Sequence, residues 1–345
     1  MGKQITISVI VPTYNGVETI ALCLAALQKQ SRRPLEVIVV DNGSHDSTQE
    51  QVRELAKDFP CDLRLIEEPK RGAAAARNCG VRAAAGEWIA FIDADCEADV
   101  DWIKAGETLV SEIYPDALAG PAWGTMQGGL SAKLLGLTTL SVGLEEHWRD
   151  SSGETGVNGF ATANFWIQKE LFEALNGFDE SLAVSGEDYD LCARVYEQGK
   201  RILYSPKLSV RHHHLSGISD LFQKALRYGR AHGMLFQRYG QPGLYFDLSN
   251  SRKSLSMNKR IWINLVSAEK KTAILVLLSF IWPGFLLLLA LYPLVMARYL
   301  RTRARKSNVE LGWLEGYCMG GLMILRSLAF TIGRIQGSSK NVWVA

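Results

Sequence analysis

The first hundred residues alternate short apolar runs with segments of helical periodicity. The apolar runs are ITISVIV (5–11), LEVIVVD (35–41), DLRLI (62–66) and EWIAFI (87–92), and helical patterns lie between them at 17–30, 46–58 and 72–85. Continuously apolar strands that alternate with helices indicate a mostly parallel sheet with helices on both faces. The pattern therefore predicts a Rossmann-like α/β domain, in which ligands bind beyond the carboxyl ends of the strands.

The C-terminal part of the chain has a different pattern. No charged residue occurs from 272 to 297, and the apolar stretch 311–333 contains only Glu315 and Arg326. A membrane-spanning helix needs about 20 apolar residues, so the first stretch is long enough to cross a bilayer. Upstream, 218–239 mixes apolar and cationic residues as an amphipathic helix does, either at a lipid interface or packed on the catalytic domain.

This pattern divides the chain into three parts. We expect a catalytic domain at 1–215, an amphipathic, interfacial helical region at 216–267, and a membrane-embedded helical pair with a basic loop at 268–345. The basic loop contains Arg298, Arg301, Arg303, Arg305 and Lys306.

The topology of the helical pair is left open by these charges. If both apolar stretches span, the basic loop lies outside, against the positive-inside tendency, although both flanks also carry cations. Pro283, Gly284 and Pro293 instead permit a broken, re-entrant hairpin that never crosses and keeps every cation on one side. In either case glycines at 312, 316 and 320 would let the second helix pack closely on the first.

Charge and cysteine content exclude some classes of protein. The net charge of +2 provides no global field for nucleic acid, so none is expected as a partner. The six cysteines show no CxxC or zinc spacing, which indicates reduced thiols of the cytosol. The start, MGKQITISVIVPTYNG, has too short an apolar run for a signal peptide and favours a first strand.

Polar residues gather where three of the predicted strands end. PTYNG (12–16) follows the first strand, DNGS (41–44) the second and DAD (93–95) the fourth. Each alone fits turn chemistry, but neighbouring strand ends of a parallel sheet lie together and can form one site. Neither GxGxxG nor a P-loop motif occurs, which argues against a dinucleotide fold or a P-loop enzyme. The pattern favours a nucleotide site that holds its phosphates through a metal.

Two acids after the fourth strand are candidate metal ligands. Asp93 and Asp95 are two residues apart, so on an extended backbone their side chains point to one side. Mg²⁺ and Mn²⁺ favour oxygen ligands, and Mg²⁺ commonly takes one or two carboxylates beside substrate phosphates. Glu97 and Asp99 continue the acidic run, and we interpret them as solvated loop acids.

A second acidic cluster lies in the segment SGEDYDLCARVYEQG (185–199). Ser185 can cap a helix there, and Gly199 suits its C-terminal end. The first turn then holds Glu187, Asp188 and Asp190. Acids in a first turn are favoured by the helix dipole, which is a purely structural explanation. A carboxylate that the dipole keeps ionised could also act as a general base.

Four motifs in this order carry a resemblance to a known family. ISVIVPTYNG, VIVVDNGSHDST, KRGAAAARNCGVRAAAGEWIAFIDADC and GFDESLAVSGEDYDLCARV together resemble the family 2 glycosyltransferases of the GT-A fold, over residues 5–215. The resemblance implies an inverting enzyme that transfers a sugar from a nucleotide diphosphate, a UDP- or GDP-sugar, with Mg²⁺ or Mn²⁺ as cofactor.

The resemblance also implies roles for individual residues. Those on the nucleotide-sugar side are Pro12, Tyr14, Asn15, Asp41, Arg71, Arg77, Asp93 and Asp95. The first three would line the base and ribose pocket, and Asp41 would hydrogen-bond the base or ribose. Of the DxD pair, Asp93 would face the ribose and Asp95 would hold the metal.

The remaining implied roles concern the metal and the base. The RHHH stretch (211–214) would add a metal ligand, for which we name His213 beside Asp93 and Asp95. Asp188 would be the catalytic base, with Glu187 as its neighbour or substitute.

We therefore expect a membrane-bound glycosyltransferase with its catalytic domain on the cytoplasmic face. Its partners would be a nucleotide-sugar donor, a lipid-linked or glycan acceptor in surface polysaccharide or glycolipid synthesis, and membrane lipid. Two other classes stay open. A sugar-phosphate nucleotidyltransferase shares the sheet but would need a glycine- and arginine-rich loop in place of PTYNG. A non-catalytic protein that binds nucleotide or glycan would tend to lose acids that are intact here.

Overall fold

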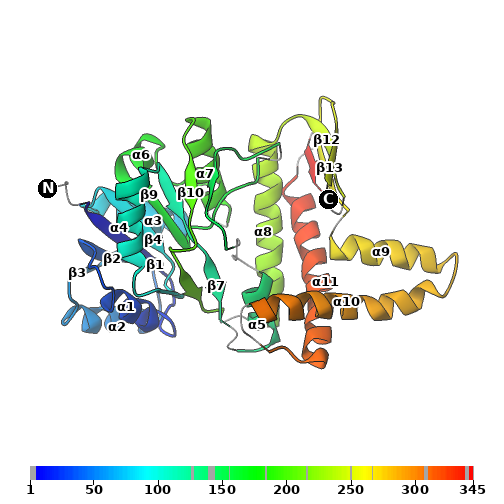
Figure 1. Ribbon diagram of the computed structural model, residues 1–345, viewed down its shortest axis with the longest axis horizontal. Coiled ribbons are helices and arrows are strands. Elements are labelled where there is room, and N and C mark those ends of the chain that lie inside the picture. The colour runs from blue at the N-terminus through cyan, green and yellow to red at the C-terminus, as the bar shows by residue number, and fades with distance from the viewer. Residues whose placement is uncertain are drawn as a thin grey trace. The chain divides into compact units, whose positions relative to one another are not determined.

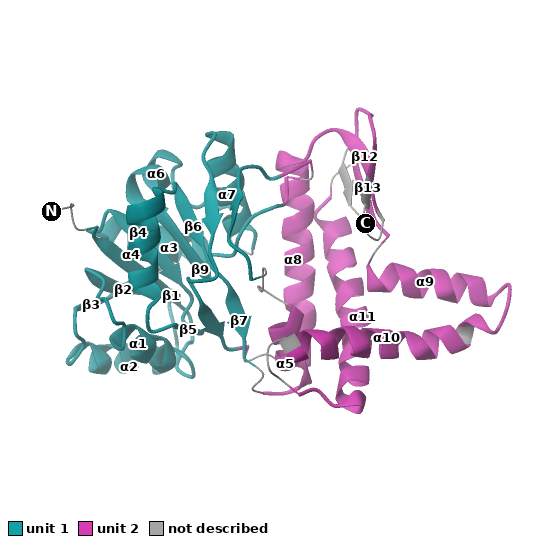
Figure 2. Ribbon diagram, viewed as in Figure 1, with its two compact units in different colours: residues 1–125, 140–152, 158–213 teal, residues 126–139, 153–157, 214–345 magenta. Residues whose placement is uncertain are grey.

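The computed structural model describes residues 5–125, 128–138, 144–154, 156–182, 185–214, 217–248, 251–265, 267–306, 310–338 and 342–344. The chain forms two compact units (Figure 2). The N-terminal unit comprises Met1–Thr125, Leu140–Ser152 and Asn158–His213. The C-terminal unit comprises Met126–Thr139, Gly153–Val157 and His214–Ala345. The three-part division predicted from the sequence stays a prediction, and its boundary at 215 lies outside the described residues.

An eight-stranded sheet forms the centre of the N-terminal unit (Figure 1). Its strand order is β3-β2-β1-β4-β9-β6-β10-β8. The first four strands in this order are parallel, whereas β9 runs antiparallel to both β4 and β6. The strands are β1 (Ile7–Thr13), β2 (Glu36–Asp41), β3 (Asp62–Glu67), β4 (Trp88–Ile92), β6 (Ala117–Ala119), β8 (His147–Arg149), β9 (Asn164–Gln168) and β10 (Ile202–Tyr204).

Helices cover both faces of this sheet, as the apolar runs predicted. Along β1, Val9 and Val11 point into one core cluster and Ile10 into the other, because side chains alternate along a strand. The cluster of Val9 includes α1 (Ile20–Gln28), α2 (Thr48–Ala56) and α4 (Trp102–Ile113). The cluster of Ile10 includes α3 (Ala73–Ala83), α6 (Lys169–Ala174) and α7 (Glu187–Glu197). The predicted mixed α/β fold is confirmed.

A small second sheet lies at the carboxyl end of β4. Its order is β5 (Cys96–Ala98), β11 (Val210–His212) and β7 (Ala122–Gly124). The antiparallel register of β5 and β11 places His212 opposite Cys96. This small sheet therefore joins the residues that follow DAD (93–95) to the histidine stretch.

The C-terminal unit consists of helices and one small sheet. Its helices are α5 (Leu130–Thr138), α8 (Ile218–Tyr239), α9 (Ala268–Ser279), α10 (Phe285–Lys306) and α11 (Trp313–Gln336). The bounds of α8 match the predicted amphipathic helix. After it, however, the chain forms strands where a helical region up to 267 was expected: β12 (Gly243–Leu248), β13 (Ser251–Leu255) and β14 (Arg260–Asn264), which β15 (Val342–Val344) joins.

The uncharged stretch 272–297 is not one helix. It is divided between α9 and α10, which a turn around Pro283 and Gly284 joins into a hairpin (Figure 1). Proline lacks the amide hydrogen that a helix interior needs, which explains the break. Among the described helices, α11 alone is long and apolar enough to cross a membrane.

Two of the three predicted glycines do bring α11 close to α10. A Cβ on Gly320 would lie 2.5 Å from the Pro293 carbonyl oxygen, and one on Gly316 would lie 3.2 Å from the Ala297 Cβ. Among the described residues, no atom lies within 4 Å of a Cβ on Gly312, which is the N-cap residue of α11.

Candidate active site

The loops after β1 and β2 are tied together by hydrogen bonds. Thr13 pairs with Asp41 at the ends of these parallel strands. Beyond them, the Asn15 amide N–H donates to Ser44 Oγ at 2.8 Å, and Asn15 Oδ1 accepts from the His45 N–H at 2.9 Å. Asn15 has a φ of 50°, a left-handed conformation that asparagine tolerates better than most residues. The predicted clustering of these two strand ends is therefore present.

Asp41 is fully buried at the base of this cluster. Its Oδ2 accepts from the Ser44 N–H at 3.1 Å and from Gln49 Nε2 at 2.8 Å. Among the described residues, Oδ1 of the same carboxyl has no hydrogen-bond partner. A buried polar atom left in this state is unfavourable unless a ligand or water supplies the missing donor.

Tyr14 and Arg71 form the exposed part of the cluster. The Arg71 guanidinium lies 4.3 Å from the centre of the Tyr14 ring, a cation–π contact, and its Nη1 donates to the Asn42 carbonyl at 3.2 Å. The Asn42 side chain in turn accepts from the Gly72 N–H, at the start of α3. These contacts bring Arg71 to the first two strand ends, and its role in nucleotide-sugar binding stays a prediction. Pro12 lies within β1, one residue before its end.

The DAD segment is a turn and not an extended strand. β4 ends at Ile92, and the Cys96 N–H donates back to the Asp93 carbonyl at 3.0 Å. Their spacing predicted that Asp93 and Asp95 point to one side of a strand, and this prediction is wrong. The two acids contact different partners. The Asp93 Oδ1 accepts from Arg77, whereas Asp95 lies beside the histidine stretch.

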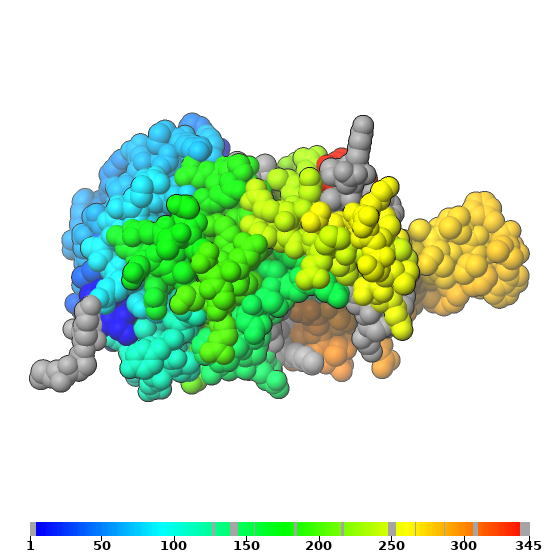
Figure 3. Space-filling model, turned by 90° about the horizontal axis from the view of Figure 1, so that it is seen from above, coloured from blue at the N-terminus to red at the C-terminus, as the bar shows by residue number. Residues whose placement is uncertain are grey.

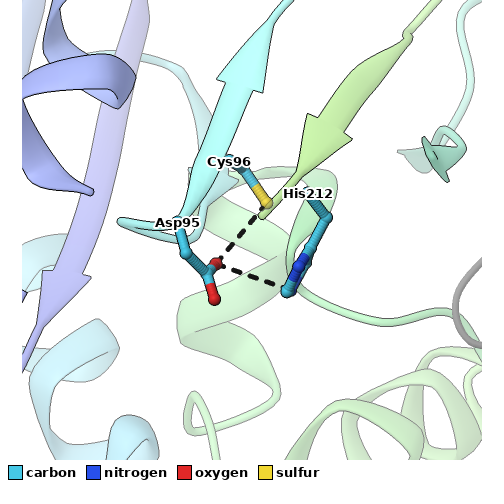
Figure 4. Close-up of side chains that lie close together, drawn as sticks. All are labelled: Asp95, Cys96 and His212. Carbon is cyan, nitrogen blue, oxygen red and sulfur yellow. Dashed lines mark hydrogen bonds and ion pairs between the residues drawn. The ribbon is translucent and has the colours of Figure 1, made fainter. Parts of the chain in front are cut away.

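Asp95, Cys96 and His212 form a cluster of possible metal ligands (Figure 4). Asp95 Oδ1 is 3.4 Å from His212 Nε2 and 3.8 Å from Cys96 Sγ. Burial, with the neighbouring carboxylates, raises the pKa of the Cys96 thiol well above its usual value, and the thiol donates to Asp95. The cluster offers a carboxylate oxygen, an imidazole nitrogen and a sulfur, of which the oxygen and the nitrogen suit Mn²⁺ or Mg²⁺.

The imidazole beside the Asp95 carboxylate is that of His212, whereas His213 meets Asp95 only through the backbone, where its N–H donates to the Asp95 carbonyl at 2.8 Å. The antiparallel register places His212 opposite Cys96, next to Asp95 in the chain. His213 instead makes a short contact through Nε2 with Glu97, which also lies 3.7 Å from Arg211. Glu97 is therefore a partly buried ion-pair partner, and its interpretation as a solvated loop acid is wrong. Asp99 is exposed, as expected.

Arg77 joins the two acidic clusters that the sequence analysis singled out. It lies on α3 and its side chain is only 6% exposed. Nη2 donates to Asp93 Oδ1 at 2.7 Å, and Nη1 donates to Glu187 Oε1 at 2.9 Å. The two carboxylates compensate for the burial of the guanidinium and raise its pKa further. Arg77 was expected beside a nucleotide, and its bridge between distant acids was not foreseen.

The second acidic cluster lies at the start of α7. The N-cap is Gly186, with a φ of 99°, and not Ser185, while Gly199 does follow the helix end with a φ of 68°. Asp190 is buried and its Oδ2 lies 2.8 Å from Arg194 Nη2, which agrees with a structural role.

The ionisation of Asp188 is strongly affected by its surroundings. Loss of hydration on burial, with the charge of Glu187 next, raises the pKa of the Asp188 carboxyl to about 7. The favourable effect of Arg77 and of a backbone N–H is smaller. We expected the helix dipole to keep Asp188 ionised at neutral pH, but burial and the charge of Glu187 outweigh the dipole, so the carboxyl is only partly ionised there. A carboxyl that titrates near neutral pH is well suited to accept a proton.

Comparisons with known proteins agree with this arrangement. The family model described as glycosyl transferase family 2 matches residues 8–133, and the one described as glycosyl transferase family group 2 matches residues 88–330. The chain is similar to glycosyltransferase AglE of Haloferax volcanii, with 29% identity over 65% of this chain and 72% of that protein. It is also similar to the glucosyl-dolichyl phosphate glucuronosyltransferase of the same organism, with 26% identity over 60% of this chain and 68% of that protein.

Solved structures show the same fold. A mannosyltransferase from Pyrobaculum calidifontis, solved in complex with GDP-Man and Mn²⁺, matches with a TM-score of 0.52 and 24% identity. The match covers 70% of this chain and 66% of that one. Because a family model covers more than half of the chain, and the strand-end motifs lie together as that family's fold requires, the chain belongs to the family 2 glycosyltransferases.

Proposed function

We propose that the protein transfers a sugar, with inversion, from a nucleotide-diphosphate sugar to a hydroxyl of a lipid-linked glycan acceptor. The observation that carries this proposal is the Arg77 bridge. It holds Asp93 of the donor side and Glu187 of the base side on one buried guanidinium. A donor site and a base must lie together for a displacement reaction, and this bridge supports their common placement.

The donor would bind at the first two strand ends. Asp41 Oδ1, buried without a partner among the described residues, is suited to accept a hydrogen bond from the base or the ribose. Tyr14 is half-exposed and lies beside Arg71. Its ring could stack on the nucleotide, and the Arg71 guanidinium could bind a phosphate. The solved structure of the Pyrobaculum calidifontis mannosyltransferase contains GDP-Man, which agrees with a nucleotide-sugar donor.

Asp95 and His212 would hold a divalent cation, Mn²⁺ or Mg²⁺. When bound, the cation would neutralise charge on the diphosphate leaving group. The carboxylate oxygen and the imidazole nitrogen fit such an ion. Whether Asp93 also contacts the ion stays a prediction, since one of its oxygens is held by Arg77.

Asp188 would act as the base. The acceptor oxygen would form a bond to the anomeric carbon while the bond from that carbon to the diphosphate oxygen breaks, and the hydroxyl proton would pass to Asp188. A positioned base contributes typically 10²–10⁴-fold to such a reaction. Glu187 is a weaker candidate because Arg77 already binds its carboxylate.

Membrane attachment and a lipid-linked acceptor form the second part of the proposal. They are supported by the long uncharged stretch in 272–297 and by a relative whose name describes a dolichyl phosphate substrate. A polyprenyl chain would stay in the bilayer and present its head group to the catalytic unit, in polysaccharide or glycolipid synthesis. Because nucleotide sugars are cytosolic, the catalytic unit would face the cytoplasm.

One experiment tests the reaction. Detergent-purified protein is incubated with a panel of UDP- and GDP-sugars, with Mn²⁺ or with EDTA, and donor hydrolysis is measured. Metal-dependent hydrolysis of one donor, abolished in Asp95→Ala and retained in the exposed control Asp99→Ala, is expected. Metal-dependent release of pyrophosphate from a nucleoside triphosphate and a sugar phosphate would instead favour the nucleotidyltransferase. Donor binding without turnover would favour a non-catalytic relative.

A further inference from the structure

The turn between α9 and α10 is an exposed apolar tip. Phe280 is 84% exposed, Ile281 80% and Trp282 61%. Behind it, of the residues from 271 to 296 whose burial the structure describes, none is buried. Figure 3 shows the gold segment around this turn standing clear of the rest of the C-terminal unit. Within 271–296, the large apolar side chains exposed on the two helices are Ile274, Val276, Leu277, Leu287, Leu288, Leu291, Leu294 and Val295.

Neither leg of this hairpin is long enough to span a bilayer. The uncharged helical part of α9, 272–279, extends about 12 Å at 1.5 Å per residue, and that of α10, 285–297, about 20 Å. The hydrocarbon core is about 30 Å thick. A hairpin of this length reaches roughly through one leaflet before the chain turns back.

A cation borders the uncharged part of each leg. Lys271 on α9 and Arg298 on α10 are exposed, and each directly borders the uncharged part of its helix. Beyond Arg298, α10 is held in the C-terminal unit by Leu300 and Ala304, which are fully buried in a cluster with α5 and α11. An apolar tip with cations at its base fits a bilayer with anionic head groups better than it fits a protein surface.

The other apolar helix, α11, is not free to enter the bilayer alone. It packs on α8 without side chains between the backbones: a Cβ on Gly229 would lie 2.1 Å from the Phe330 carbonyl oxygen, and one on Gly333 would lie 2.2 Å from the Leu226 carbonyl oxygen. A spanning α11 would therefore take α8 with it. The exposed face of α8 carries Asp220, Arg227, Arg230 and Arg238, which hydrocarbon strongly disfavours.

We propose that the hairpin of α9 and α10 is a re-entrant membrane anchor. Its tip at Phe280–Trp282 inserts into one leaflet, both legs leave on the side where they entered, and the α8–α11 pair stays outside the hydrocarbon. Every cation then lies on one side of the membrane, which removes the conflict with the positive-inside tendency. The inference deepens the proposed membrane attachment and does not depend on the proposed reaction.

Vesicle binding tests the tip. Full-length protein is mixed with vesicles of phosphatidylcholine and phosphatidylglycerol, without donor or acceptor, and the bound fraction is measured by flotation. Phe280→Asp should weaken binding about 50-fold, because an ionised side chain is strongly disfavoured inside the hydrocarbon. Tyr114→Asp is the matched control: this residue is 83% exposed, lies in the N-terminal unit and has a φ of 53°, which Asp tolerates. Equal binding of both variants, or self-association in place of vesicle binding, would overturn the proposal.

Depth measurements separate the hairpin from a spanning α11. A nitroxide label is placed at Ile281→Cys or at Leu325→Cys in a Cys318→Ser background. The Cys318→Ser protein without a new cysteine, treated with the same label, is the blank. Oxygen accessibility gives the depth of each label in the vesicles. The label at 281 should lie deep and the label at 325 shallow. A deep label at 325 would mean that α11 spans, and a shallow label at 281 would mean that the tip does not insert.

Two further readouts complete the test. In sealed vesicles an impermeant maleimide should label Lys271→Cys and Arg298→Cys equally, whereas protection of only one would mean that a leg crosses. Donor hydrolysis in detergent is measured on Phe280→Asp as well. If it persists while vesicle binding is lost, the anchor stands apart from the reaction. If hydrolysis is absent in the wild type too, the proposed reaction fails and the anchor result still holds.

Discussion

The substitution Asp188→Asn should remove a charge that the folded protein tolerates poorly. The folded pKa of Asp188 is about 7, against an ordinary value of 3.8. Because the folded state holds this proton more tightly than the unfolded state, stability is present at low pH and is lost as the pH rises toward 7. At 1.36 kcal/mol per pKa unit, the wild-type carboxylate costs on the order of 4 kcal/mol at pH 8 and little at pH 4.

The assay is thermal unfolding of wild type and variant across this pH range, without metal or donor. Asp188→Asn should unfold at a higher temperature than wild type at pH 8, by several degrees for each kcal/mol regained, and at nearly the same temperature at pH 4. The same variant should keep its donor affinity and lose transfer by about 10²-fold or more. Both results would follow if the Asp188 carboxylate serves as the base but lowers the stability of the folded protein when it is ionised.

The control is Asp190→Asn, two residues along the same helix. Asp190 is fully buried and paired with Arg194 at 2.8 Å, so its replacement should lower the unfolding temperature at pH 8. The reasoning is refuted if Asp188→Asn destabilises the protein at pH 8, if its effect is independent of pH, or if transfer is unchanged.

Three other substitutions test separate parts of the structure. Arg77→Met should destabilise the fold by about 3–5 kcal/mol in chemical denaturation, because it leaves the carboxylates of Asp93 and Glu187 without their buried cation. An unchanged denaturation midpoint would contradict the bridge. His212→Ala should weaken Mn²⁺-dependent donor binding in calorimetry far more than His213→Ala, and the reverse order would restore His213 as the ligand. Gly333→Ala should destabilise the C-terminal unit by about 1–3 kcal/mol in thermal unfolding, because its Cβ meets the backbone of α8. By contrast Gly321→Ala on the same helix, where a Cβ would have no atom of the described chain within 4 Å, should be neutral or stabilise by up to about 1 kcal/mol. Equal effects of the two changes would refute the close helix contact.

Features that depend on local periodicity could be predicted from the sequence. Continuously apolar runs predicted the central strands, because a strand of a covered parallel sheet is buried on both sides. The bounds of α8 followed from its amphipathic period, and the meeting of Asn15 with the loop after Asp41 followed from the rule that parallel strand ends share one edge. Each of these needs only the order of residues along a short segment.

Features that depend on distant contacts were decided by the tertiary structure alone. The imidazole of His212, and not that of His213, lies beside the Asp95 carboxylate because β11 runs antiparallel to β5 in one register, and side chains alternate between the two faces of a strand. Arg77 joins acids 16 and 110 residues away in the chain, a relation that no spacing encodes. The pKa of Asp188 is set by burial beside Glu187, and burial is a property of the packed chain and not of a motif.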